Sequence, residues 1–271
     1  MLQPRSRRSS AWLLMLLISM GAEMLPGLGC HAQATTTQPA PASAPLDPAV
    51  EQWLDRLQEQ SEQTKTFQGN VRYDRNQKLV GDRQRRFGTL VYAVGPPAKF
   101  AVHFDRLVVD ERVDKQDRWY IFDGQWQVER IDDEKQFIKR QVVAPNAPPD
   151  RANPLGIGEG PFVLPVTMKK DRILKCFDVS LVEPAPAELP NTVHLKLVPK
   201  PNRRSDYSQI DLWYDRASLL PVRAQALDES ENETVIEVSK PRVNEPVEEK
   251  VFDTDEPKEA GWHVEVTPWE E

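Results

Sequence analysis

From Phe67 onward, apolar and polar side chains alternate with a period of two, the pattern of strands that bury one face. Turn-forming pairs such as Gly81-Asp82 and Asp123-Gly124 separate several of these segments. The predicted strands are 68–75, 83–94, 99–105, 107–113, 118–122, 125–131, 136–143, 177–183, 191–199, 208–214, 220–227, 233–239 and 262–266. Short strands at such regular intervals predict an antiparallel sheet that curls or closes.

Two other regions have helical character. Asp47 and Pro48 form a typical helix start, and an apolar stripe that begins at Val50 predicts a helix on the order of sixteen residues long. Residues 144–165 are rich in Pro and Gly yet keep several apolar side chains, and a helix-like segment, 169–177, follows them. This insertion is either a lid over a ligand or a plug that covers the core without a ligand. The chain is therefore predicted to be one α+β domain of about a dozen strands.

The first residues have the parts of a secretory signal. Arg5, Arg7 and Arg8 precede the apolar run 11–19, and Ala32-Gln33-Ala34 supplies a cleavage site, so 1–34 is predicted to be a signal peptide. Residues 35–46 are Thr-, Pro- and Ala-rich and predict a flexible tether. We therefore expect the chain to be exported. Cys30 follows a lipobox-like Gly27-Leu28-Gly29, which makes it a candidate for lipidation and leaves two outcomes open, a soluble protein or a membrane-anchored one.

Composition argues against several classes of function. The 271 residues carry a net charge of −7, which provides no general attraction for nucleic acid. The four His lie far apart, and the two Cys exclude a cysteine-cluster metal site, so no metal and no cofactor are expected. His103 and Asp105 are two residues apart on one strand, but no nucleophile can be tied to them, so a surface pair is expected there. The sequence therefore does not predict an enzyme.

Large apolar side chains recur on the predicted strands. A curled sheet with one apolar face either fills its hollow with side chains or leaves a cavity for an apolar ligand. The candidate cavity residues are Phe100, Val102, Phe104, Trp119, Ile121, Trp126, Phe137 and Leu212. The candidate lid residues are Leu155, Ile157, Phe162 and Leu164.

The order of segments resembles the bacterial outer-membrane lipoprotein carriers, the LolA/LolB-like proteins, and their RseB-like relatives. The segments that carry this resemblance are Phe67-Gln68-Gly69, Gly88-Thr89-Leu90-Val91-Tyr92, Pro97-Ala98-Lys99-Phe100, Tyr120-Ile121-Phe122-Asp123-Gly124-Gln125-Trp126, Pro161-Phe162-Val163-Leu164, Leu195-Lys196-Leu197-Val198-Pro199-Lys200, Ile210-Asp211-Leu212-Trp213-Tyr214-Asp215, Leu220-Pro221-Val222, Thr234-Val235-Ile236, Arg242-Val243-Asn244, Val251-Phe252-Asp253 and Gly261-Trp262-His263-Val264. They follow one another through nearly all of residues 50–266. One departure is that Pro96 stands where the carriers have the Arg that latches their lid.

The resemblance implies that 47–271 form a curled, unclosed antiparallel β-barrel with an N-terminal helix and a mid-chain helical lid over a hydrophobic cavity. It implies a periplasmic carrier that holds the acyl chains of lipoproteins or other lipids without catalysis. The alternative is an envelope sensor or regulator on the same fold that binds envelope or membrane proteins and transports nothing. Neither alternative involves nucleic acid.

Overall fold

The computed structural model describes residues 46–147, 162–164, 166–201 and 205–269. These residues belong to the compact unit Pro45–Glu271. The predicted signal peptide with Cys30, the predicted tether up to residue 45, and the candidate lid residues Leu155 and Ile157 lie outside the described residues. The expectations that concern them remain predictions.

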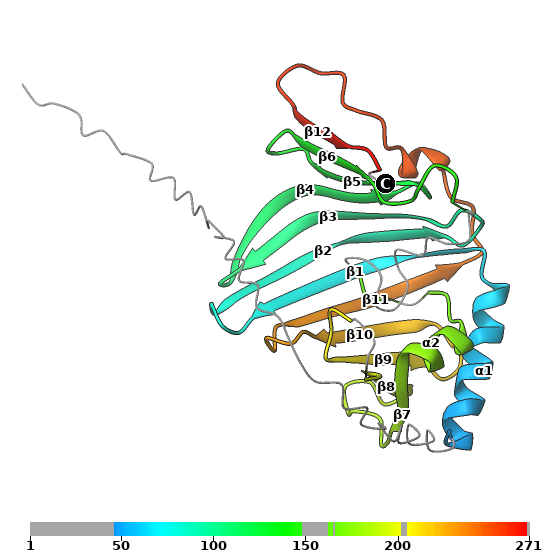
Figure 1. Ribbon diagram of the computed structural model, residues 1–271. Helices are drawn as coiled ribbons and strands as arrows, with labels where there is room; N and C mark the ends of the chain where they lie inside the picture. Colours follow the sequence, from blue (N-terminus) through cyan, green and yellow to red (C-terminus); the bar gives the residue numbers. More distant parts are fainter. Residues whose placement is uncertain (1–45, 148–161, 165, 202–204, 270–271) are drawn as a thin grey trace, which may run out of the picture. The chain divides into compact units, whose positions relative to one another are not determined.

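The described residues form two α-helices, one short 3-10 helix and twelve strands (Figure 1). The helices are α1 (Pro48–Gln63), α2 (Lys170–Cys176) and η1 (Glu249–Phe252). The strands are β1 (Thr66–Gln77), β2 (Asp82–Ala93), β3 (Lys99–Val109), β4 (Arg112–Phe122), β5 (Trp126–Ile131), β6 (Gln136–Gln141), β7 (Phe177–Val182), β8 (Thr192–Pro199), β9 (Gln209–Asp215), β10 (Pro221–Leu227), β11 (Glu233–Val243) and β12 (His263–Thr267).

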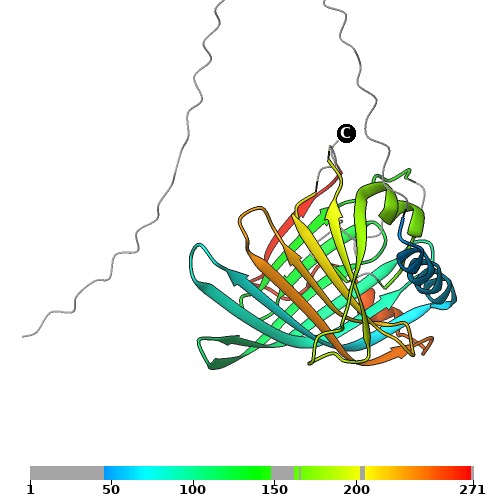
Figure 2. The same ribbon diagram turned by 90° about the horizontal axis from the view of Figure 1, so that it is seen from below.

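All twelve strands belong to one sheet, in the order β12-β6-β5-β4-β3-β2-β1-β11-β10-β9-β8-β7. The end strands β12 and β7 do not pair with each other, and Figure 2 shows the sheet curved but not closed. The predicted fold class, a curled and unclosed β-barrel with two helical additions, is therefore confirmed. One pairing departs from the antiparallel prediction, because β12 runs parallel to β6.

Helix α1 begins where the sequence predicts it. The Asp47 carboxylate accepts a hydrogen bond from the Ala49 amide at 2.8 Å, and Pro48 occupies the first turn, where a missing N–H costs nothing. Its buried stripe of Val50, Leu54 and Leu57 faces the sheet. Helix α2 lies beside α1 near the β7 end of the sheet (Figure 1). In the described part of the chain, no helix has both the length and the apolar character of a membrane span.

The hairpin of β3 and β4 differs from the prediction. The sequence predicts strands 99–105, 107–113 and 118–122, whereas the structure has two long strands that meet at a turn formed by Asp110 and Glu111. Both turn residues have positive φ, 48° and 66°, a conformation usually signalled by Asn or Gly. Because Asp-Glu is a weak turn signal, the predicted break is misplaced. The Asp123-Gly124 turn is confirmed, with Asp123 Oδ1 accepting hydrogen bonds from two following amides.

Candidate functional site

The two faces of the sheet are buried by different parts of the chain. On one face, a large cluster of buried side chains joins β1–β4 to β7–β11 and includes residues from both α-helices. We call this the concave face, because strands far apart in the sheet meet in one cluster there. On the opposite, convex face, η1 packs on β3 and β4 in a smaller cluster centred on Val128 and Phe252. Any apolar ligand site has to be sought separately on each face.

The structure divides the candidate cavity residues between these faces. Phe100, Val102, Phe104 and Leu212 belong to the concave cluster. Trp119, Ile121 and Phe137 belong to the convex cluster. Trp126 lies on the same face, because it is two residues from Val128 in β5. Its ring also lies 4.9 Å from the ammonium of Lys139, which pairs with Val128 in β6. The eight residues therefore do not line one surface.

The cause of this division is the composition of β4. Its segment Trp119-Tyr120-Ile121-Phe122 is apolar at every position, so the two-residue period does not reveal which pair faces inward. The pairing register decides it: Phe122 opposes Phe100, whereas Ile121 opposes Ala101 on the other face. Tyr120 and Phe122, which the sequence reasoning missed, are the concave-face residues of this strand.

A short apolar segment fills the middle of the concave face. We call Phe162, Val163, Leu164, Val166 and Met168 the plug; all five are buried in the concave cluster. The Phe162 ring is 6% exposed, and it lies 5.3 Å from the ring of Tyr120, 5.9 Å from Tyr73, 6.0 Å from Phe100 and 6.3 Å from Phe104. The candidate lid residues Phe162 and Leu164 are thus part of the packed core rather than of an outer cover.

The C-terminal side of the plug is fixed by hydrogen bonds. The side chain of Thr167 is hydrogen-bonded to that of Tyr92 on β2. The Met168 carbonyl accepts a bond of 3.1 Å from the Ser61 hydroxyl of α1, and the Lys170 amide donates to Gln58 Oε1 at 2.9 Å. By contrast, the described contacts of the Phe162 side chain are apolar. Hydrogen bonds therefore hold the Met168 end of the plug, and ring packing holds the Phe162 end.

The concave face becomes polar toward the end of β4 remote from Phe122. Arg118 lies 5.8 Å over the Tyr120 ring and makes a 2.7 Å ion pair with Glu129 of β5. Burial raises the pKa of the Tyr120 hydroxyl to about 12, and the nearby Glu129 carboxylate acts in the same direction. This hydroxyl therefore stays protonated at neutral pH and acts as a hydrogen-bonding group, not as a base.

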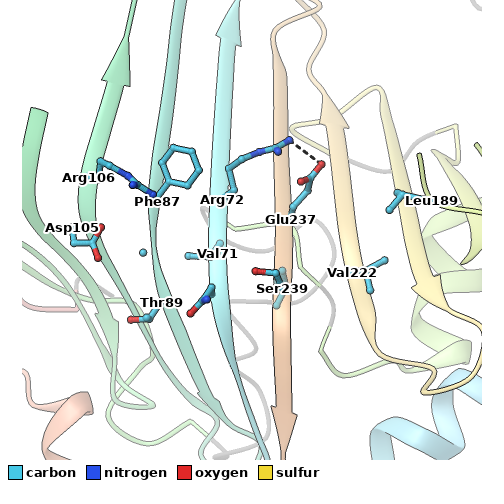
Figure 3. Close-up of a pocket in the computed structure, with 13 residues that line it drawn as sticks. Val71, Arg72, Phe87, Thr89, Asp105, Arg106, Leu189, Val222, Glu237 and Ser239 are labelled. Carbon is cyan, nitrogen blue, oxygen red and sulfur yellow. Dashed lines mark ion pairs between the residues drawn. The ribbon is translucent and has the colours of Figure 1, made fainter. Parts of the chain in front are cut away.

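The convex face carries an open groove across β1, β2 and β11. Its volume is about 760 Å³, and its lining includes Arg72, Phe87, Thr89, Arg106 and Glu237 (Figure 3). It lies where register shifts occur in neighbouring pairs, among them β2 with β3 at Phe87 and Gly88. A β-carbon on Gly88 would lie 1.8 Å from the His103 carbonyl oxygen, so only glycine permits the strands to approach this closely.

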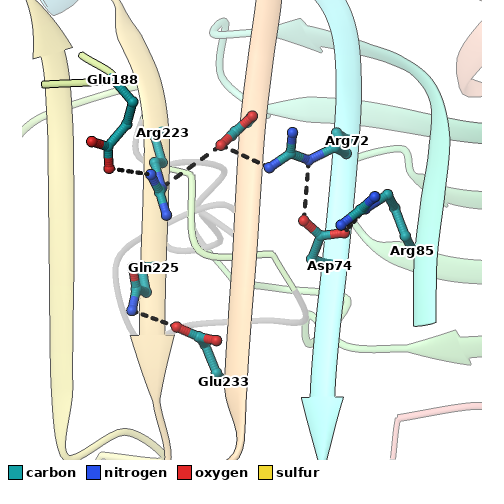
Figure 4. Close-up of polar contacts among 8 residues, drawn as sticks. Arg72, Asp74, Arg85, Glu188, Arg223, Gln225 and Glu233 are labelled. Atoms are coloured by element: carbon teal, nitrogen blue, oxygen red, sulfur yellow. Dashed lines mark hydrogen bonds and ion pairs between the residues drawn. The ribbon is translucent and has the colours of Figure 1, made fainter. Parts of the chain in front are cut away.

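Beside the groove, charged side chains connect four strands. Glu237 of β11 lies 2.9 Å from Arg72 of β1 and 3.8 Å from Arg223 of β10, and Arg72 continues through Asp74 to Arg85 of β2 (Figure 4). These side chains are roughly one-eighth to two-fifths exposed, so each pair contributes about 1 kcal/mol or less to stability. This charged network makes the centre of the convex face polar.

His103 shows the expected surface pairing with a different partner. Its Nε2 lies 2.9 Å from Asp117 of β4, and its ring stacks on Trp119 at 3.9 Å. His194 repeats this arrangement with Asp211 at 2.7 Å and Trp213 at 4.2 Å. Neither cluster includes a hydroxyl or thiol nucleophile, and no group of three potential metal ligands occurs among the described residues. The described concave cluster is mainly apolar.

Comparison with known proteins gives structural matches only. No family model matches the chain, and no curated protein sequence is similar to it. An uncharacterized conserved protein from Thermus thermophilus matches with a TM-score of 0.46 and 14% identity, over 82% of this chain and 99% of that one. The MucA/MucB complex of Pseudomonas aeruginosa matches with a TM-score of 0.38 and 20% identity, over 75% of this chain and 60% of that one. A LolA superfamily protein from Nitrosomonas europaea matches with a TM-score of 0.34 and 11% identity, over 74% of this chain and 97% of that one. The last of these proteins is named as a member of the superfamily that the segment order resembles; with identities of 20% or less and TM-scores below 0.5, none of the three matches carries an argument about this chain.

Proposed function

We propose that the protein is an exported, non-catalytic binding protein that holds the acyl chain of a lipid or lipoprotein on the concave face. The observation that carries this proposal is the Phe162 ring, which sits among four aromatic rings of the sheet and occupies the place that a ligand chain would take. Each buried methylene contributes about 0.8 kcal/mol, so an apolar surface of this kind binds a chain without any catalytic group.

The proposal includes the N-terminal region. Cleavage after Ala34 would release a soluble carrier into the periplasm, whereas lipidation of Cys30 would tie the same domain to a membrane through residues 31–46. Mass spectrometry of the mature N-terminus separates the two forms, because lipidation adds acyl mass to a chain that begins at Cys30. A chain that begins at Met1 would contradict both forms, since it would show that the signal peptide is not cleaved.

The binding proposal is tested with the full chain, expressed with its own leader and purified without detergent. We expect native mass spectrometry to find acyl-chain mass on the protein, and a fluorescent fatty acid to bind it. Phe100→Ala should weaken that binding about tenfold, because it removes a ring from the chain-binding surface. The matched control is Phe137→Ala, since Phe137 is equally buried but belongs to the convex cluster. Equal effects of the two substitutions, or absence of any binding, would overturn the proposal.

A second candidate function is supported by the convex face. The 760 Å³ groove and the charged network beside it offer a polar surface of the kind that binds a protein segment. In that case the molecule is an envelope sensor or regulator with a filled concave core. A protein that takes up no fatty acid, but loses a co-purified protein partner on Arg72→Glu, would favour this second function.

A further inference from the structure

Arg86 marks the point where the concave face changes from apolar to charged. It opposes Tyr73 in the pairing of β1 with β2, and no register shift interrupts that pairing. Leu90 and Tyr92 of the same strand belong to the concave cluster, as does the packed ring of Tyr73. The two-residue period therefore places the Arg86 side chain on the concave face, next to the aromatic cluster that surrounds Phe162.

Arg86 has no acidic partner among the described residues. Its guanidinium donates a hydrogen bond from Nη2 to Gln84 Oε1 at 2.8 Å, and its Nε is buried without a partner. Burial is the main cause that lowers the pKa of Arg86, and the neighbouring Arg118 and Arg75 act in the same direction. Buried cations are normally paired, since an uncompensated charge is costly to remove from water. Among the described residues, an anion is the group that this position lacks.

The neighbouring charges do not supply that anion. Glu129 is engaged by Arg118, with Nη2 at 2.7 Å and Nε at 3.0 Å from the same carboxylate oxygen. Arg75 lies within electrostatic range of Arg86 on one side and of Asp228 on the other. Three guanidinium groups thus lie near one end of the concave face, and among the described residues Arg86 is the one of them with no carboxylate beside it. A negatively charged head group would pair with that guanidinium.

The positive end is continuous with the apolar surface. Tyr120 links the two, because its ring packs on Phe162 at 5.3 Å while Arg118 lies over the same ring at 5.8 Å. Tyr73 makes a second link, with its ring 5.9 Å from Phe104 and within electrostatic range of Arg86. A single molecule with an apolar chain and an anionic end would match an apolar surface that leads directly to these arginines.

We propose that Arg86, assisted by Arg118, binds the carboxylate or phosphate head of an anionic amphiphile whose chain lies on the concave aromatic surface. This inference rests on the proposed function and adds the class of ligand to it. A planar guanidinium with free N–H groups suits a two-oxygen head group, which can accept two parallel hydrogen bonds. The Nε of Arg86, unpartnered in the structure, is one of those donors.

The test compares two probes that share one chain and have a charged or a neutral head group: dansylaminoundecanoic acid and its methyl ester, each titrated below its micelle concentration. We expect the acid to bind the unmodified protein about tenfold more tightly than the ester. Arg86→Gln should remove this preference and leave the affinity for the ester unchanged. Arg86→Lys should keep part of the preference, because it retains the charge but not the fork of donors. Thermal unfolding of each variant checks that it folds.

The matched control is Arg85→Gln. Arg85 is the adjacent residue of β2, its head lies on the convex face, and it is bound to Asp74 at 2.5 Å. This variant should keep the preference for the acid. The head-group assignment would be overturned if the ratio of acid affinity to ester affinity were unchanged in Arg86→Gln, or if Arg85→Gln lost the preference equally. Binding of both probes would still support the proposed function in that case. Failure of both probes to bind would instead overturn the proposed function and this inference with it.

A third titration separates the amphiphile from a free anion. Inorganic phosphate, with no chain, should bind too weakly to raise the melting temperature at millimolar concentration. If phosphate raises the melting temperature through Arg86 and the acid probe is not preferred over the ester, the site binds small anions. That result would refute the proposal of an amphiphilic ligand.

Discussion

Replacing Phe162 with alanine tests whether the plug competes with a ligand for the concave face. Burying a phenylalanine contributes about 1.5–3 kcal/mol, and aromatic pairs add about 0.5–1.5 kcal/mol each, so loss of a ring with four ring neighbours should cost about 3 kcal/mol or more. For a domain of this size, about 3 kcal/mol corresponds to a fall of about 6–12 °C in melting temperature. We expect that fall in a thermal unfolding experiment without ligand.

The same substitution should have the opposite effect on binding. A chain that takes the place of the Phe162 ring must first displace it, and the variant no longer spends that free energy. Since 1.4 kcal/mol corresponds to a tenfold change, recovery of about 3 kcal/mol corresponds to a gain in affinity of about 100-fold. We expect the fluorescent fatty acid to bind Phe162→Ala more tightly than the unmodified protein, by up to this factor.

Phe137→Ala provides the control for this experiment. Phe137 is 1% exposed and its loss should lower the melting temperature as well, but it packs on the convex face with η1 and should leave the affinity for the probe unchanged. If Phe162→Ala weakens binding, then Phe162 contacts the ligand instead of competing with it. An unchanged affinity would show that the ligand binds away from the plug, and either result refutes the reasoning.

Three further predictions concern the sheet. Glu237→Gln removes the carboxylate shared by two convex-face arginines, so it should lower the melting temperature by about 2–4 °C and leave fatty-acid binding unchanged. Burial acts to raise the pKa of Asp211, but hydrogen bonds from His194 and Gln209 outweigh it and the pKa lies below its ordinary value. The stabilisation from this lowered pKa is present above the unfolded-state pKa of about 3.9 and is lost as the pH falls through the folded-state pKa. Asp211→Asn should therefore make the free energy of unfolding depend less on pH in the acid range, and an unchanged dependence would contradict this. Gly88→Ala should lower the free energy of unfolding by about 3 kcal/mol or prevent folding, whereas Gly95→Ala, with open space at its β-carbon, should not; equal denaturation midpoints for the two variants would refute the steric argument.

The sequence predicted the order and most bounds of the elements because local signals define them. The cap at Asp47, the Asp123-Gly124 turn and the two-residue alternation each act within a few residues. The β3–β4 turn was misplaced because Asp110 and Glu111 adopt positive φ without the residues that signal it. Parallel pairing of β12 with β6 was not predictable from the segments themselves, since it depends on how the chain returns after η1.

The eight candidate cavity residues were expected on one face, and only half of them share the concave face, for a different physical reason. Alternation identifies a face only where the other face is polar, and β4 is apolar on both because the C-terminal segment covers its convex side. That cover comes from residues around Phe252, more than a hundred positions later, so no local pattern in β4 records it. The plug was predicted as an apolar insertion, but its ring contacts depend on the curvature that brings β1, β3 and β4 together.

The asymmetry of the plug indicates how a chain could enter without unfolding the domain. Hydrogen bonds near Thr167, Met168 and Lys170 are buried or partly buried, and breaking a fully buried one leaves an unpaired polar group at a cost of about 1–3 kcal/mol. The apolar contacts of the Phe162 side chain carry no such penalty, because a ligand chain restores equivalent contacts to the rings that it uncovers. Exchange at the Phe162 end is therefore close to balanced, while exchange at the α1 end is not. A ligand that fits this arrangement displaces the ring and leaves the hydrogen-bonded end in place.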